Sequence, residues 1–205
     1  MSTASTYPGA TRGPADHEVR DQIALAATAH FRLYGYEKTT VSDLAKAIGF
    51  SKAYIYKFFQ SKQAIGELIC ANCLRQIEAD ARAAVDGVDL PQEKLRRLFK
   101  VLVESSLRLF CEDRKLYDIA AAASCGQWQA ARTFDEHVKA MLADILRRGR
   151  ELEEFERKTP FDETAAAIYL VVRPYLNPPL LRNNLDSATD AASQLSSLVL
   201  RSLSP

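Results

Sequence analysis

Eight residues between positions 40 and 62 carry groups that suit contact with DNA. They lie in the stretch TTVSDLAKAIGFSKAYIYKFFQSKQAI, residues 39–65. Hydroxyl and ammonium groups donate hydrogen bonds to phosphate oxygens, and a lysine also donates to the O6 and N7 atoms of guanine. The candidates for DNA contact are Thr40, Ser51, Lys52, Ala53, Tyr54, Tyr56, Lys57 and Lys62.

Two short helices joined by a tight turn are predicted to position these groups. Thr40 and Asp43 have the spacing of a capping box at the start of the first helix, and Gly49 is suited to end it in a left-handed conformation. Ser51 then caps a second helix, residues 52–58. This order is typical of a helix-turn-helix, whose second helix enters the major groove.

The charge of the chain is concentrated around this stretch. The 205 residues have a net charge of only +1, but five lysines face one acid between Lys38 and Lys62, a local charge of +4. A local basic patch is expected where a protein meets phosphate, although a solvated lysine face has the same composition. Charge alone therefore leaves both interpretations open.

A longer helix is predicted before the pair, from about Asp16 to Tyr34, with Gly35 ending it. Apolar residues recur along it at steps of three and four, which predicts one buried face. Residues 1–15 are rich in Ser, Thr, Pro and Gly and lack such periodicity, so we expect a flexible arm. The three helices together predict a compact unit.

The stretch from Ala26 to Ile65 resembles the DNA-binding domain of the tetracycline-repressor (TetR) family of bacterial regulators. The resemblance covers roughly residues 16–76. Residues 56–64 carry the signature Y-x-x-F-x-S-K-x-A that closes the family's recognition helix. The matching positions, in order, are Phe31, Gly35, Tyr36, Thr40, Val41, Ile48, Gly49, Tyr56, Phe59, Ser61, Lys62 and Ala64.

The resemblance and the residue chemistry assign similar roles. The first turn of the second helix, residues 51–54, faces base edges, and Lys52 is suited to guanine. Tyr56 and Lys62 resemble the family's phosphate clamps, and Thr40 begins a helix whose N-terminus suits a phosphate. Tyr56 could instead be an aromatic residue of the core. We interpret Phe59 as a core residue.

A fourth helix, from Lys62 to about Asp86, is long enough to leave the DNA-binding unit and enter a second domain. It carries Cys70 and Cys73, a C-x-x-C pair. No strand and helix start precede the pair as in a thioredoxin-type motif, and a zinc site needs two further ligands. We interpret both thiols as packing groups, with a thiol-based redox-responsive or metal-responsive regulator as the alternative.

The remaining sequence predicts helices throughout. The expected fold class is therefore all-α, with about nine helices: an arm (1–15), a TetR-type helix-turn-helix DNA-binding domain (16–76) and a helical ligand-binding and dimerisation domain (77–205). Pro174 is expected to kink the helix that follows Thr159-Pro160. By resemblance, the last two helices pair with their copies to form a homodimer, and the small residues at 165–167 and 191–193 permit close approach.

The resemblance also implies a cavity for a small-molecule inducer of unknown identity. Aromatic, thioether and isolated polar side chains are typical of such pockets, although each is also common in a core. Arg173 is the exception, because it interrupts an apolar helix and needs either an acid across the dimer or an anionic ligand. The candidates for ligand contact are Phe99, Leu102, Phe110, Tyr117, Trp128, Phe134, Met141, Tyr169 and Arg173.

These features together predict a sequence-specific transcriptional regulator that binds a double-stranded DNA operator. The resemblance alone implies a repressor that an inducer releases from the operator, and the residues leave activation open. No phosphate-binding loop, H-E-x-x-H or serine elbow indicates an enzyme, so we expect no catalytic residue, metal or cofactor. The longest apolar run, residues 165–172, is far below the ~20 residues that span a bilayer. A cytoplasmic protein is expected; a helical adaptor is the alternative function.

Overall fold

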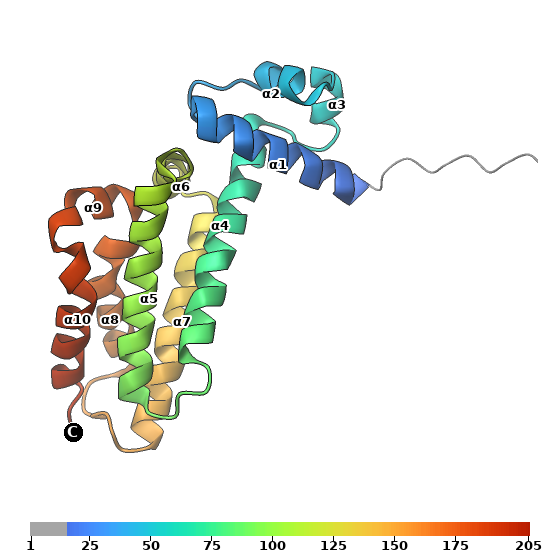
Figure 1. Ribbon diagram of the computed structural model, residues 1–205. Helices are drawn as coiled ribbons and strands as arrows, with labels where there is room; N and C mark the ends of the chain where they lie inside the picture. The colour runs from blue at the N-terminus through green and yellow to red at the C-terminus, as the bar shows by residue number, and fades with distance from the viewer. Residues whose placement is uncertain (1–15) are drawn as a thin grey trace, which may run out of the picture.

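The computed structural model describes residues 16–205, so the predicted N-terminal arm lies outside the described residues. This part of the chain is all-α, with no strand, and its elements form a small unit set on one end of a taller bundle (Figure 1). The helices are α1 (Asp16–Tyr34), α2 (Val41–Ile48), α3 (Lys52–Tyr56), α4 (Lys62–Val85), α5 (Pro91–Glu112), α6 (Arg114–Cys125), α7 (Gln129–Glu151), α8 (Phe161–Leu176), α9 (Pro178–Asn183) and α10 (Leu185–Ser202).

The helix caps of the N-terminal unit confirm the predicted starts and end of the helices in the helix-turn-helix. The Thr40 hydroxyl accepts from the Asp43 amide at 3.2 Å, and the Asp43 carboxylate accepts from the Thr40 amide at 2.9 Å. These bonds to Thr40 lower the pKa of Asp43, because they stabilise its charged form. Gly49 ends α2 with φ +80°, and the Ser51 hydroxyl accepts from the Tyr54 amide at 3.0 Å.

Helix α3 ends two residues earlier than predicted. The amides of Lys57 and Phe58 bond to carbonyls three residues back, so the chain tightens into a turn after Tyr56. Arg20 of α1 supports this turn, since it donates to the Phe58 carbonyl at 2.6 Å and lies 4.5 Å from the centre of the Phe59 ring. Phe59 itself is buried in the core, as predicted.

Helix α4 links two hydrophobic cores. Its first half contributes Ile65 and Ile69 to the core of the N-terminal unit, which also includes the buried side of α6. Its second half contributes Ile77 and Ala81 to the core of the bundle, where they join side chains of α5, α7, α8 and α10. The N-terminal core therefore extends into α6, and we keep the predicted division at residue 76 as a proposal.

The described residues form ten helices, where about nine were predicted. Helix α9 was not predicted; the Asn177 side chain caps it and two prolines suit its first turn. Pro160 is the cap residue of α8, and no side chain caps this helix. Helix α8 continues past Pro174 to Leu176.

No helix among residues 16–205 is long and apolar enough to cross a membrane.

One glycine marks a close approach at the far end of the bundle. A Cβ atom on Gly149 of α7 would lie 2.0 Å from the ring of Phe155, which is 3% exposed. Phe155 is in the loop after α7, and its amide bonds to the Gly149 carbonyl at 3.1 Å. The chain can therefore fold back on α7 only where a side chain is absent.

We predict that Gly149→Ala lowers the free energy of unfolding by about 1–3 kcal/mol, because the added methyl group overpacks the contact with Phe155. Chemical denaturation monitored by circular dichroism measures the change. Glu136→Ala, an exposed change in the same helix, is the control and should stay within about 0.5 kcal/mol. An equally stable Gly149→Ala protein would contradict the packing described.

Candidate nucleic-acid interface and ligand cavity

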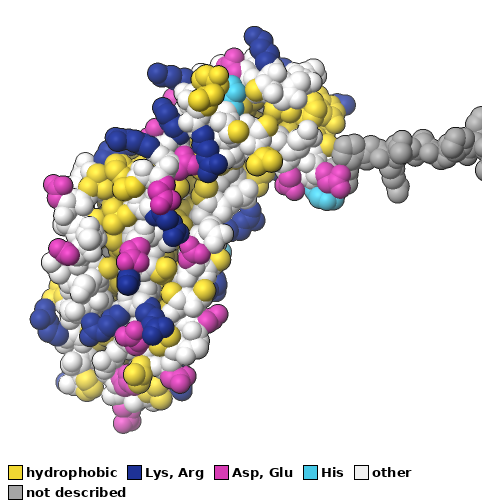
Figure 2. Space-filling model, viewed as in Figure 1, with side chains coloured by type: hydrophobic (Ala, Val, Ile, Leu, Met, Phe, Trp, Pro, Cys, Tyr) yellow, Lys and Arg dark blue, Asp and Glu magenta, His cyan; other side chains and the backbone are white. Residues whose placement is uncertain are grey.

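The start of α3 presents an exposed surface. Ser51, Lys52 and Ala53 are exposed on its first turn, and Thr40 is exposed at the start of α2. Lysine and arginine side chains project from the outer surface of this unit (Figure 2). The first turn of a recognition helix usually contacts base edges, and the exposure of Ser51, Lys52 and Ala53 leaves them free for that predicted role.

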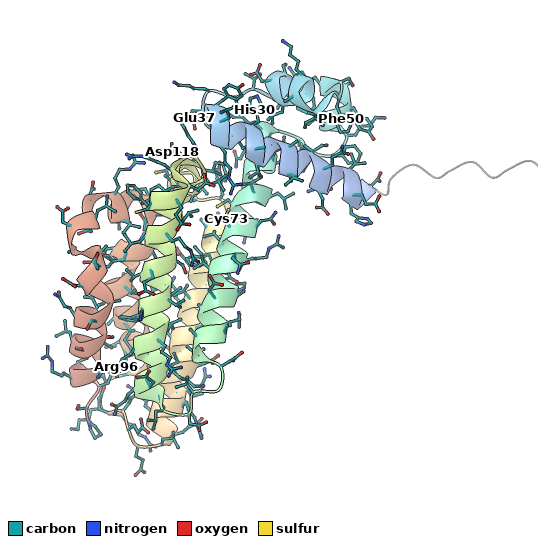
Figure 3. The ribbon with its side chains drawn as sticks, viewed as in Figure 1. His30, Glu37, Phe50, Cys73, Arg96 and Asp118 are labelled. Carbon is teal, nitrogen blue, oxygen red and sulfur yellow. The ribbon has the colours of Figure 1, made fainter. Side chains whose placement is uncertain are left out.

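Tyr54 is partly used for packing. Its ring meets Phe50 and Phe58 edge-on at 5.0 and 5.2 Å, and Phe50 lies in the turn between α2 and α3 (Figure 3). The Lys57 ammonium lies 5.6 Å from the centre of the same ring. The aromatic contacts fix the position of α3, so Tyr54 supports the surface that its neighbours present.

Tyr56 and Lys62 lie in different settings. Tyr56 is 44% exposed, with the Lys52 ammonium 5.8 Å from its ring centre, which leaves its hydroxyl accessible. The Lys62 ammonium donates to the carbonyls of Tyr36 and Glu37 at 3.0 and 3.4 Å and lies over the Tyr36 ring. Lys62 thus joins α4 to the loop after α1, and a phosphate contact would have to share its ammonium with these carbonyls.

A cavity of about 80 Å³ lies in the bundle, between α4 at Cys70, α6 at Ala120 and α9 at Leu181. Of the predicted ligand residues, Tyr117, Phe134 and Arg173 line it. The Tyr117 hydroxyl donates to the Pro178 carbonyl, and Asn177 donates to the Ser124 hydroxyl at 2.7 Å. Burial raises the pKa of Tyr117 to about 12, so its hydroxyl remains a donor at neutral pH.

The other predicted ligand residues lie elsewhere. Phe99, Leu102 and Met141 are in the bundle core, and Phe110 packs edge-on against Tyr117 at 4.8 Å. Trp128 belongs to the N-terminal core, and Tyr169 lines an outer groove between α7 and α8. Aromatic type alone could not separate these positions, since aromatic residues fill cores and pockets alike.

Sequence reasoning missed most of the cavity wall. The missed residues are small, aliphatic or polar, and they come from six helices and two connections. The spacing of Arg132 and Asp135, three residues apart on α7, was the one pattern in the sequence that could have predicted a polar part of the cavity wall. The missed residues are Cys70, Leu74, Ile77, Ser106, Leu109, Ala120, Ser124, Gln127, Ala131, Arg132, Asp135, Leu176, Asn177, Pro178 and Leu181.

Three contacts join the cavity region to the N-terminal unit. The Tyr36 and Trp128 rings meet edge-on at 5.8 Å above Gly66 of α4, where a Cβ atom would lie 2.8 Å from Tyr36. The carboxylate of Glu67 accepts from the Gln129 amide at 2.7 Å, at the start of α7. Arg32 of α1 pairs with Asp113 at the start of α6.

The cysteines give no support to the thiol-based alternative. Cys70 is buried, and burial, with Cys73 beside it, raises its pKa to about 12. Burial also raises the pKa of Cys73, which lies on α4 near the junction (Figure 3). Both thiols are therefore protonated at neutral pH, whereas a reactive cysteine is a thiolate. Residues 16–205 contain no group of three or more His, Cys, Asp or Glu that could hold a metal ion.

Together, the helix-turn-helix and the helical domain with its cavity define a class of protein, the ligand-responsive DNA-binding regulators. Residues 23–67 match the family described as bacterial regulatory proteins, tetR family, and residues 91–195 match the tetracyclin repressor-like C-terminal domain. The chain belongs to the tetR family of bacterial regulatory proteins, and it is a DNA-binding transcriptional regulator.

Named relatives share limited identity with the chain. The transcriptional repressor KstR2 of Mycolicibacterium smegmatis is 27% identical over 63% of this chain and 64% of its own length. FadR of Bacillus subtilis, in complex with stearoyl-CoA, is 17% identical with a TM-score of 0.66, covering 89% of this chain and 98% of its own. FadR of Thermus thermophilus, in complex with lauroyl-CoA, is 21% identical with a TM-score of 0.65, over 89% and 94%.

We predict that Lys52→Ala changes base preference, whereas Lys62→Ala weakens binding to every DNA sequence. Loss of one phosphate contact should reduce the slope of log affinity against log salt by about one unit. Selected and random duplexes, titrated across a salt series, measure both effects. Lys100→Ala, on the distant face of α5, is the control. Unchanged affinity and slope in both variants would contradict the roles assigned to Lys52 and Lys62.

Proposed function

We propose that this protein represses its target genes as a homodimer and leaves its operator when a small molecule occupies the cavity beside α4. The observation that supports this most is the position of the cavity. Cys70 and Leu74, two of its wall residues, stand on the same helix that begins with Lys62 at the DNA-binding unit. A ligand that displaces this part of α4 also displaces the helix that supports the DNA-binding unit.

The proposed operator contacts are those predicted from the sequence. Ser51, Lys52 and Ala53 face the bases with Tyr54 beside them, Thr40, Tyr56 and Lys62 face phosphates, Lys57 is a further DNA contact, and the DNA-binding unit comprises residues 16–76. One such unit covers too little DNA for useful specificity, so two half-sites about one helical turn apart are expected. A regulator of this kind works in the cytoplasm, where it acts on DNA without catalysing a reaction.

The proposed dimer uses the outer surfaces of α8 and α10. Leu170 and Leu198 are 60% and 54% exposed on these helices, and the small side chains Ala166, Ala167 and Ser193 are exposed beside them. Exposed leucines among small residues favour close packing of a second helical pair. The same two helices from each subunit would then form a four-helix interface.

The experiment that tests the function is selection of bound duplexes from a random pool. We predict that the enriched sequences share one motif with two similar half-sites in inverted orientation, their centres about 10 base pairs or a multiple apart. A pool that shows no enrichment after repeated rounds would contradict sequence-specific binding. It would favour the adaptor interpretation of the helical domain.

We predict that Leu198→Glu shifts the protein from dimer to monomer and lowers operator affinity by at least about tenfold, because an unpaired carboxylate is costly to bury. Analytical ultracentrifugation and a gel shift measure the two effects. Leu90→Glu, at a leucine that is 60% exposed before α5, is the control. A Leu198→Glu protein that remains dimeric would place the interface elsewhere.

A further inference from the structure

The outer side of α1 carries a strip of exposed apolar residues. Leu25, Ala29 and Leu33 are exposed and follow one another at steps of four, so they lie along one side of the helix. Leu25 is 75% exposed, more than any other large hydrophobic residue among residues 16–205, and Leu33 is 68% exposed. We call these three residues the outer strip of α1.

The outer strip does not contribute to the core of the N-terminal unit. Helix α1 packs against α2, α4 and α6, and other residues form its buried side. Leu25 and Leu33 neither belong to the core of this unit nor pack against it. A contiguous apolar patch that stays exposed in the folded chain is typical of a surface that meets another protein.

The outer strip is open to a second molecule. Helix α1 lies across the top of α4, and its N-terminal half extends beyond the bundle (Figure 1). Residues 1–15 precede this helix, but Met1 and Tyr7 are the only large apolar residues among them. The composition of that segment is therefore poorly suited to covering two leucines.

The shape of the outer strip suits a second copy of itself. Residues at steps of four form the ridges that interlock where two helices cross, and a small residue at the crossing lets the helices approach closely. Ala29 lies between the two leucines, about 6 Å from each along the helix axis. Two α1 helices that cross at Ala29 in opposite directions would place Leu25 of each molecule beside Leu33 of the other.

The charges along α1 favour opposite directions for the two helices. Residues 16–21 hold three acids and one arginine. At the other end, Arg32 pairs with Asp113 but remains 58% exposed, and the Lys115 ammonium lies beside the glycine that follows α1. The loop after α1 adds one acid and one base. An antiparallel pair brings the acidic end of each helix towards the basic end of the other and also opposes the two helix dipoles.

The contact is too small to hold two molecules together in free solution. Three residues on each side cover far less than the ~1,200 Å² that a stable interface buries. Two dimers that are bound side by side on one duplex are held at a high effective concentration, so a weak contact between them is sufficient. The outer strip is therefore suited to a contact that forms on DNA.

We propose that two dimers of this protein bind neighbouring operator sites cooperatively, through antiparallel contact between the outer strips of their α1 helices. The occupant of each outer strip is thus the same strip in an adjacent dimer. This inference goes beyond the proposed function, which concerns one dimer on one operator, and it rests on the homodimer proposed there.

Binding to duplexes with one and two copies of the selected motif tests the cooperativity. At one preferred spacing, we expect the second dimer to bind about tenfold more tightly than the first, because the leucines lose exposed apolar area at the contact. The double variant Leu25→Gln, Leu33→Gln should fill the two sites independently and keep its affinity for the one-site duplex. Leu90→Gln, at a leucine that is 60% exposed before α5, is the control. Independent filling by the unaltered protein at every spacing would overturn the proposal.

Cross-linking tests the geometry of the contact without a known operator. Because Ala29 meets its own copy at the crossing, Ala29→Cys should form a disulfide between dimers under mild oxidation on long random-sequence DNA, and far less without DNA. Leu90→Cys and the unaltered protein, with its exposed Cys111 and Cys125, give the background. Cross-linking of Ala29→Cys no greater than this background would overturn the proposal.

Other occupants of the outer strip predict different results. If residues 1–15 covered it, Leu25→Cys would react slowly with a maleimide until those residues were removed. If a different protein covered it, the purified chain would show neither cooperative binding nor the cross-link. Either result would overturn the proposal.

The two experiments also separate this proposal from the proposed function. A protein that selects a motif but fills paired sites independently, without the cross-link, refutes the α1 contact alone. A protein that selects no motif but cross-links through Ala29→Cys on random-sequence DNA refutes the proposed function and retains the α1 contact.

Discussion

The packing of Tyr36 and Trp128 over Gly66 is the contact on which the arrangement of the two halves depends. It joins the loop after α1, the beginning of α7 and the first turns of α4 without a side chain between them. The Lys62 ammonium binds the carbonyl of the same Tyr36. The orientation of the DNA-binding unit is therefore fixed at the point where α4 enters the bundle.

Coupling between ligand and DNA has a short physical route in this arrangement. Cys70 belongs to the core of the N-terminal unit and also lines the cavity, while Leu74 packs against both cores. Helix α6 closes the other side, since its buried face completes the N-terminal core and its Tyr117 and Ala120 face the cavity. A shift of either helix changes both cores, because close-packed interiors accommodate discrete rearrangements rather than gradual ones.

Local signals made the N-terminal unit readable from the sequence, whereas the cavity depended on tertiary packing. Thr40, Gly49 and Ser51 indicate helix ends through patterns that span only a few residues, and the structure confirms each of these ends. No local pattern separates Phe99, which lies in the core only, from Phe134, which lies in the same core and also lines the cavity. Helix α9 was not predicted, although Asn177 and the two prolines after it suit a helix start.

Cys70 and Leu74 line the cavity and also pack in the cores, Cys70 in that of the N-terminal unit and Leu74 against both, which limits how such a regulator can diversify. A substitution on α4 that admits a new ligand also alters the packing that supports the DNA-binding unit. Ligand specificity and operator affinity therefore change together. Leu176 and Leu181, on the opposite wall, touch the cavity without belonging to the N-terminal core. Evolution of new ligand specificities at constant operator preference is therefore expected to concentrate on α8 and α9.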